Sequence, residues 1–295
     1  MEGKIIKGIA GFYYVQTDER VYECKARGKF RNDKQSPLIG DLVKVSITDY
    51  VGSTDYLQGS IEEILPRKNQ LIRPPVANVD QGLIVFSLSY PAMNIDLLDR
   101  FLVMMEKANI HAIIILNKLD DIKSDEYKKI VKGYKLTGYE IYTISAKNNQ
   151  NVELIAELLK DKTSFFAGPS GVGKSTILNS ICPNFALQTG EVSSKIKRGK
   201  HTTRHVELLK LDNSGYVLDT PGFTSLQFAN VTEQELKDCF IEFRKYASEC
   251  KFKECNHIHE PNCKVKEAFE NNLIYKSRYN SYVSYYEELK NNKKW

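Results

Sequence analysis

The chain has 295 residues, of which 42% are hydrophobic and 11% aromatic, and its formal net charge at pH 7 is +5. This length and apolar content are sufficient for two or three domains with real cores. No apolar run approaches the ~20 residues of a membrane span, and the N-terminal residues lack signal-peptide character. The mild basic charge is compatible with RNA binding, but an ordinary soluble enzyme fits it equally well.

The first part of the chain, up to about residue 66, predicts a small β-barrel of the OB type. Turn residues separate five short strand patterns, at residues 3–8, 12–16, 21–26, 41–47 and 59–65. Barrels of this type often bind oligonucleotides. The best candidates for such contact are the basic residues of one expected loop, Arg27, Lys29, Arg31 and Lys34. A packing module without a ligand, whose basic loop is only solvated, is the alternative.

A basic, proline-marked connector at residues 66–75 precedes a change to alternating strands and helices. We expect strands at residues 83–88, 112–116, 140–144 and 163–167. We expect helices at residues 95–108, 124–136, 152–159 and 175–181, with Ser124 as a cap of the second. Continuous apolar strands between helices predict a parallel sheet that is covered on both faces.

Two motifs at strand ends indicate a guanine-reading site. Asn117 to Asp120 matches the N-K-x-D motif of GTPases. The Asp120 carboxylate can accept hydrogen bonds from guanine N1–H and its 2-amino group, a donor pair that adenine lacks. Asn117 would contact the base, and the stem of Lys118 would cover one ring face. A companion loop follows the third strand: Ser145, Ala146 and Lys147. In it, the backbone N–H of Ala146 would meet guanine O6.

The stretch from residue 168 to 175 reads G-x-x-x-x-G-K-S, the phosphate-binding loop pattern. Its residues are Gly168, Pro169, Ser170, Gly171, Val172, Gly173, Lys174 and Ser175, and Thr176 follows. Glycines allow backbone N–H groups to point at an anion, and the following helix N-terminus adds partial positive charge. Lys174 would reach the β- and γ-phosphates, and Ser175 would ligate Mg²⁺. A chance glycine-rich turn is the alternative.

The segment from residue 188 to 204 is polar, basic and punctuated by glycine, which suits a nucleotide-dependent switch. Thr203 is our choice for a Mg²⁺ ligand in it, and Thr202 is the rival. Strand patterns at residues 204–211 and 215–219 follow. They lead into Asp219-Thr-Pro-Gly222, which matches D-x-x-G. Asp219 would hold Mg²⁺ through water, and the Gly222 N–H would sense the γ-phosphate.

The order of these motifs is circularly permuted, because both base-reading motifs precede the phosphate loop. In ordinary small GTPases the phosphate loop comes first. Permutation preserves the site in space, since each motif still stands at a strand end. It also leaves the D-x-x-G motif next to the C-terminal region of the chain.

The C-terminal region holds three cysteines and one histidine that fit a tetrahedral Zn²⁺ site: Cys250, Cys255, His257 and Cys263. His259 lies nearby, and free thiols with coincidental spacing are the alternative. Helices are expected around these ligands at residues 232–246 and 264–289. In the last stretch basic residues alternate with aromatic ones: Lys276, Arg278, Lys290, Lys293 and Lys294 with Tyr275, Tyr279, Tyr282, Tyr285, Tyr286 and Trp295. This stretch would either dock on RNA or pack its tyrosines on the zinc module.

The combination of an OB-type barrel, a permuted GTPase and a Cys₃His module resembles the bacterial RsgA family, also called YjeQ or YloQ. The resemblance covers essentially the whole chain. It implies an OB-fold domain at residues 1–66, a GTPase domain at 67–226 and a zinc-binding domain at 227–295. It also implies a cytoplasmic, monomeric GTPase that binds the small (30S) ribosomal subunit and its rRNA late in maturation. In such a protein the ribosome would stimulate slow GTP hydrolysis.

The resemblance also bears on catalysis. Phe223 stands where many GTPases place a water-orienting glutamine, and phenylalanine cannot orient water. In this family a histidine is proposed to orient the water instead, and the matching residue here is His201. Lys200 precedes it, where some relatives have a neutral polar residue. Two other functions remain open: a binding module in which the nucleotide is mainly structural, and a regulatory GTPase that acts away from the ribosome.

Overall fold

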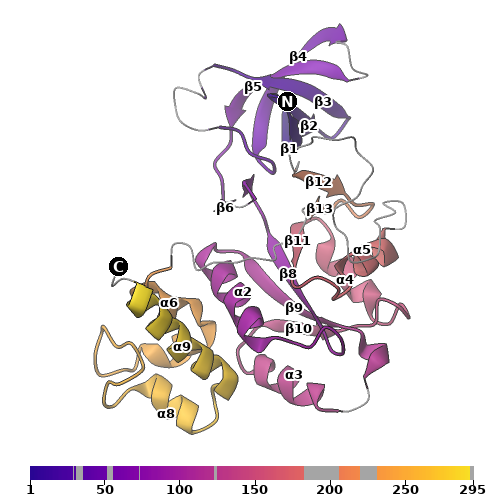
Figure 1. Ribbon diagram of the computed structural model, residues 1–295. Coiled ribbons are helices and arrows are strands. Elements are labelled where there is room, and N and C mark those ends of the chain that lie inside the picture. Colours follow the sequence, from indigo (N-terminus) through magenta and orange to yellow (C-terminus); the bar gives the residue numbers. More distant parts are fainter. Residues whose placement is uncertain are drawn as a thin grey trace. The chain divides into compact units, whose positions relative to one another are not determined.

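The computed structural model describes residues 1–28, 30, 36–51, 56–72, 74–122, 125–182, 206–219 and 231–292; its elements are labelled in Figure 1. The chain forms two compact units. The first comprises residues 1–81, 154–166 and 192–221, and the second comprises residues 82–153, 167–191 and 222–295. Among the described residues, no helix combines the length and the apolar character that crossing a membrane requires.

Five strands of the first unit close into a barrel (Figure 1). They are β1 (Glu2–Ile9), β2 (Phe12–Gln16), β3 (Val21–Ala26), β4 (Leu42–Val51) and β5 (Leu57–Ile64). Their order is β1-β2-β3-β5-β4, and β4 pairs back with β1. Alternate residues point inward, so that Ile5, Val15, Val43 and Ile61 are fully buried. The predicted OB-type barrel is therefore confirmed.

The strands of the barrel continue into three further strands of the same unit. These are β11 (Thr163–Ala167), β12 (Glu207–Lys210) and β13 (Tyr216–Asp219), in the order β11-β13-β12-β1. β1 pairs antiparallel with β12 at Lys7 and Glu207, whose side chains form an ion pair of 3.2 Å. The Lys4 amine donates to the Thr163 hydroxyl at 2.8 Å. The barrel is thus joined to the strand that leads into the phosphate loop.

The predicted connector contains a short hairpin, β6 (Gln70–Leu71) and β7 (Val76–Ala77). An ion pair ties it to the barrel. Arg67 donates two hydrogen bonds, of 2.7 and 2.8 Å, to the Asp41 carboxylate, whose side chain is fully buried. Paired arginine–carboxylate bonds of this kind fix orientation as well as distance. The connector is therefore packed against the barrel within the first unit.

The second unit contains strands in the order β10-β9-β8. They are β8 (Gln81–Ser87), β9 (His111–Asn117) and β10 (Glu140–Thr143). β9 and β10 pair in parallel, and the apolar residues of β8 and β9 are buried on both faces, as predicted. Helices α2 (Ile95–Lys107), α3 (Tyr127–Lys135) and α5 (Lys174–Ile181) and the 3₁₀ turn η1 (Leu119–Asp121) belong to this unit. Helix α4 (Val152–Leu159), which completes the alternation along the chain, lies mostly in the first unit. α3 begins three residues later than predicted, and its expected cap Ser124 lies outside the described residues.

The C-terminal segment is more broken than predicted. The expected helix at residues 232–246 is wrong, because the segment forms α6 (Glu233–Leu236), η3 (Lys237–Cys239), η4 (Ile241–Phe243) and α7 (Arg244–Ala247). Phe240 interrupts it with non-helical backbone angles and places its ring 5.2 Å from that of Tyr282. The second expected helix is two helices, α8 (Lys264–Glu270) and α9 (Lys276–Asn292), separated by Asn272 in the left-handed conformation.

A buried ion network joins this C-terminal segment to α2. The Arg278 side chain is fully buried, and it donates to Asp99 of α2 at 3.0 Å and to Glu242 at 2.7 Å. Tyr134 donates to the same Asp99 oxygen at 2.7 Å. Tyr279, Tyr282 and Tyr285 are also buried. These tyrosines of α9 therefore pack against the C-terminal segment and α2, as the packing alternative predicts.

Replacing Arg278 with methionine should destabilise the C-terminal segment, because it leaves the Asp99 and Glu242 carboxylates buried without their cation. Breaking one side of a buried ion pair costs about 3–5 kcal/mol. Urea denaturation followed by circular dichroism measures this loss. Lys264→Met is the control, since it removes an exposed ion pair with Glu267 in the same module. Equal urea midpoints for Arg278→Met and Lys264→Met would contradict a larger stability contribution of the buried network.

Candidate nucleotide and metal sites

The loop from Gly168 to Ser175 has a backbone that only glycine adopts readily at three positions. Gly168, Gly171 and Gly173 have φ values of 130°, 77° and 98°. A Cβ atom on Gly168 would lie 2.1 Å from the Val85 carbonyl oxygen, and one on Gly173 would lie 2.4 Å from the Asn117 amide nitrogen. The loop is therefore held against the ends of β8 and β9. Other side chains at these two glycines would push it away.

Lys174 begins α5 and folds back over this loop. Its amine donates to the carbonyl oxygens of Gly168 and Pro169, both at 2.7 Å. Burial lowers the pKa of the Lys174 amine to about 8. An anion beside the amine would favour the charged form and raise this pKa again. Ser175 and Thr176, the next two residues of α5, are half-buried at the same helix start.

Asn117 brings three separate motifs together. It is the last residue of β9 and is only 2% exposed. Its amide nitrogen donates to the Val172 carbonyl in the phosphate loop at 2.9 Å. Its amide oxygen accepts from the backbone N–H of Ala146 in the companion loop at 3.1 Å. One side chain therefore fixes the end of the N-K-x-D strand, the phosphate loop and the companion loop.

Lys118 adds a second link across the site and shows a contact that sequence reasoning missed. Its backbone is left-handed, with φ of 67°, and its amine donates to the Gly171 carbonyl at 2.8 Å. The same amine donates to the carbonyl of Tyr90, in the turn between β8 and α2. Every residue has a backbone carbonyl, so the residue type at position 90 does not indicate this contact. Only the position of the turn, directly after a buried strand, could have suggested it.

Asp120 is held by the companion loop. The Ser145 hydroxyl donates to its carboxylate at 2.5 Å and accepts from the backbone N–H of Asn148 at 3.2 Å. The Ser145 hydrogen bond, and more weakly the charges of Lys147 and Lys118, hold the pKa of the Asp120 carboxyl below its usual range. The carboxylate is exposed, so it is both ionised at neutral pH and accessible to a ligand.

Several residues predicted for the switch lie outside the described part of the chain. They are His201, Thr202, Thr203, Gly222 and Phe223. Asp219 is the last residue of β13, and its side chain also lies outside the description. In the barrel loop, Arg27 forms an ion pair with Glu62 at 2.6 Å. Lys29, Arg31 and Lys34 lie outside the described residues.

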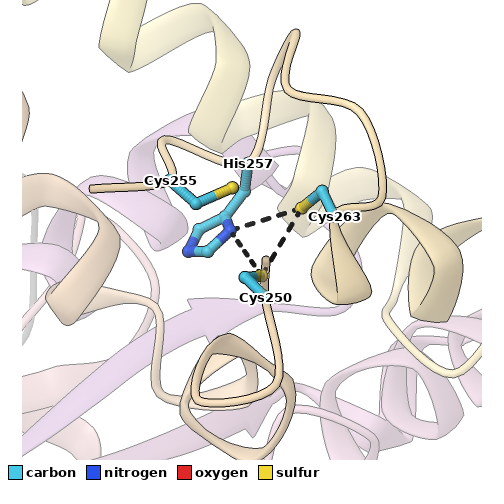
Figure 2. Close-up of side chains that lie close together, drawn as sticks. All are labelled: Cys250, Cys255, His257 and Cys263. Carbon is cyan, nitrogen blue, oxygen red and sulfur yellow. Dashed lines mark hydrogen bonds between the residues drawn. The ribbon is translucent and has the colours of Figure 1, made fainter. Parts of the chain in front are cut away.

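The four predicted metal ligands converge in the C-terminal segment (Figure 2). The ligand atoms of Cys250, Cys255, His257 and Cys263 all lie within 4.8 Å of one another. His257 Nδ1 is 3.6 Å from the Cys250 sulfur and 3.4 Å from the Cys263 sulfur, and these sulfurs are 3.9 Å apart. Tetrahedral Zn²⁺ with its usual bond lengths separates two sulfur ligands by about 3.8 Å. The donor set and its spacing therefore fit a metal ion.

The surrounding structure holds the ligand loop in this shape. The Glu260 carboxylate accepts hydrogen bonds from the backbone N–H groups of Asn256, Ile258 and His259. The Tyr279 hydroxyl donates to the His257 carbonyl at 2.7 Å. Burial raises the pKa of the Cys255 thiol to about 12 and lowers the pKa of His257 to about 4. The imidazole is thus neutral at pH 7, whereas Cys255 needs a cation to become a thiolate.

Two family models match the sequence. A model described as RsgA GTPase matches residues 64–229, and one described as RsgA N-terminal domain matches residues 2–52. The first covers more than half of the chain. Both models carry the same family name.

Proteins similar over the whole length carry the same name. The chain is 49% identical to the small ribosomal subunit biogenesis GTPase RsgA of Alkaliphilus metalliredigens, over 100% of this chain and 99% of that protein. It is 47% identical to the protein of that name from Caldanaerobacter subterraneus subsp. tengcongensis, over 100% and 97% of the two chains.

Two solved structures are similar throughout. The crystal structure of YloQ, a circularly permuted GTPase, has a TM-score of 0.83 and 40% identity, and covers 99% of this chain and 95% of that one. YjeQ from Thermotoga maritima has a TM-score of 0.84 and 38% identity, and covers 98% of each chain. Sequence, fold and the site around Asn117 agree, and the chain belongs to the RsgA GTPase family.

Proposed function

We propose that this GTPase binds the small (30S) ribosomal subunit late in its maturation and hydrolyses GTP there, with turnover that the subunit stimulates. The full-length relatives named as small ribosomal subunit biogenesis GTPases support this proposal. So does the closed N-terminal barrel, a fold that commonly contacts RNA. We place the protein in the cytoplasm, as a monomer, with an OB-fold domain at residues 1–66, a GTPase domain at 67–226 and a zinc-binding domain at 227–295.

The observation that carries the nucleotide assignment is the pair of Asn117 hydrogen bonds to Val172 and Ala146. They tie the loop that would hold phosphates to the loop that would meet guanine O6. Asp120, kept ionised by Ser145, would then accept from guanine N1–H and the 2-amino group. Lys118 would cover the base, and Lys147 would add positive charge beside Asp120.

At the phosphate end, backbone N–H groups of residues 170–176 would bind the anion at the start of α5, and Gly168 and Pro169 would complete the loop. Lys174, whose amine already lies over the loop, would turn to the β- and γ-phosphates. Mg²⁺ supplies charge neutralisation at these phosphates, and Ser175, Thr203 and Asp219 would hold it. The Gly222 N–H would sense the γ-phosphate. Phe223 cannot orient the attacking water, so we assign that task to His201.

We further propose that Cys250, Cys255, His257 and Cys263 hold one structural Zn²⁺. Three thiolates and one imidazole form a closed tetrahedral set with no position left for a substrate. The Cys263 sulfur also accepts from the backbone N–H of Lys266 at the start of α8. A helix N-terminus favours a thiolate there. The ion would stabilise the C-terminal segment rather than take part in hydrolysis.

The proposed function is tested by GTP turnover with and without purified small ribosomal subunits. We expect slow turnover alone and a large increase with subunits. His201→Ala should keep GTP and subunit binding but lose most of the stimulated rate, because a positioned general base contributes about 10²–10⁴-fold. His111→Ala is a matched control, since His111 pairs with Glu140 on the surface of β9.

Three results would count against this account of catalysis. If subunits neither bind nor stimulate the wild-type protein, its action on the ribosome is wrong. If His201→Ala weakens subunit binding but retains turnover at saturating subunits, His201 contacts RNA and does not orient water. If His111→Ala loses as much stimulation as His201→Ala, the loss is not specific to His201.

The zinc site predicts one Zn²⁺ per chain in protein purified without chelators. Cys255→Ala should release the ion and unfold mainly the C-terminal segment, because metal binding and local folding are linked. Cys239→Ala is the matched control: Cys239 is a buried cysteine of the same core but not a member of the ligand set. Elemental analysis and limited proteolysis measure both effects. Wild-type protein without zinc, or equal zinc loss in both variants, would rule the site out.

A further inference from the structure

A small basic cavity lies beside the cysteine–histidine ligand set. It has a volume of about 160 Å³. Three cations line it, Lys237, Arg244 and Lys253, together with one carboxylate, Asp238. Cys255 and His257, two of the predicted metal ligands, form part of its wall. Neither the nucleotide site nor the metal site uses these cations.

Two of the cations are fixed in place by backbone or side-chain partners. The Lys237 amine donates to the Cys255 carbonyl, a neutral acceptor, at 3.2 Å. Arg244 uses one nitrogen to donate to Glu106 and to the Asp238 carbonyl, both at 2.9 Å. The guanidinium has five N–H groups, so donors remain beyond these two bonds. In the part of the chain that the structure describes, the Lys253 side chain has no hydrogen bond or ion pair.

His257 adds a polar group to the same cavity. Figure 2 shows its Nδ1 atom facing the cysteine sulfurs and its other ring nitrogen on the far side of the ring. With a metal on Nδ1, the other nitrogen would carry the proton and would act as a donor. Lys237 and His257 line the same cavity. The cavity wall therefore carries donors and positive charge.

We propose that this cavity binds a phosphate group. Cations gathered around one small space repel one another, and an anion of matching size converts that repulsion into charge-assisted hydrogen bonds. A phosphate presents several acceptor oxygens, whereas the wall presents lysine, arginine and imidazole donors. The phosphate comes either from an RNA backbone or from free inorganic phosphate. The RNA source rests on the proposed function at the ribosome, and the free source does not.

The test uses the full-length, zinc-loaded protein with GDP saturating the phosphate loop. Inorganic phosphate is titrated by calorimetry, and small ribosomal subunits are titrated over a range of salt concentrations. Lys253→Gln should weaken phosphate binding several-fold and lower the salt slope of subunit binding by about one, the value expected for one lost phosphate contact. Asp238→Asn should strengthen phosphate binding, because it removes the carboxylate that repels the anion. Lys253→Arg should bind like the wild type.

Lys251→Gln is the matched control. Lys251 is exposed in the same loop two residues away, but its amine lies over the Phe252 ring and does not line the cavity. If only the calorimetric titration separates Lys253→Gln from Lys251→Gln, the ligand is free phosphate; if the subunit titration separates them as well, it is RNA. If neither titration separates them, the proposal is wrong. The proposal is also wrong if Lys253→Gln loses zinc but binds phosphate like the control. The cations would then only balance the charge of the cysteine thiolates.

Failure of this proposal is distinguishable from failure of the proposed function. If the wild-type protein does not bind small subunits at all, the ribosomal role is wrong. The phosphate titration still decides whether the cavity is an anion site. If the wild-type protein binds subunits and all variants behave alike, the ribosomal role stands and the cavity assignment falls.

Discussion

The proposed nucleotide site depends on one buried amide. Asn117 donates to the phosphate loop and accepts from the companion loop, and its short side chain leaves no room for a Cβ on Gly173. An amide is suited to this task because it is both donor and acceptor and carries no charge that burial would penalise. Aspartate could not donate, and leucine could do neither. The circular permutation is tolerated for this reason: hydrogen bonds between strand ends, not chain order, assemble the motifs.

The N-terminal barrel and the C-terminal segment are stabilised by different interactions. The barrel is joined to its neighbouring strands by the antiparallel pairing of β1 with β12 and by the Lys7–Glu207 ion pair. The C-terminal segment is held by the buried Arg278 network, and its four converging cysteine and histidine side chains would add a bound metal ion. Much of the C-terminal segment is irregular, and its core is rich in tyrosine. Because tyrosine hydroxyls need hydrogen-bond partners when buried, specific polar contacts supplement the burial of apolar surface there.

Much of the architecture could be predicted from the sequence because strands and helices here have clear periodicity. The barrel strands, α4 and β11 follow their expected positions closely. The helix expected at residues 232–246 failed because Phe240 breaks the backbone to bury its ring, a tertiary effect that periodicity does not contain. The roles of Arg278 and of the Tyr90 carbonyl were equally out of reach. A buried arginine looks like a surface one in sequence, and a carbonyl has no side-chain signature.

We propose that residues from two strand ends bind guanine in the permuted fold. The most direct test is the nucleotide preference of Asp120→Asn, measured by titration of GDP and xanthosine diphosphate. The account predicts weaker guanine binding and a preference for xanthine, because the new amide can donate to the xanthine 2-oxo group. Asp121→Asn, which changes the adjacent exposed carboxylate, should keep the wild-type preference. An unchanged preference for guanine in Asp120→Asn would contradict the account.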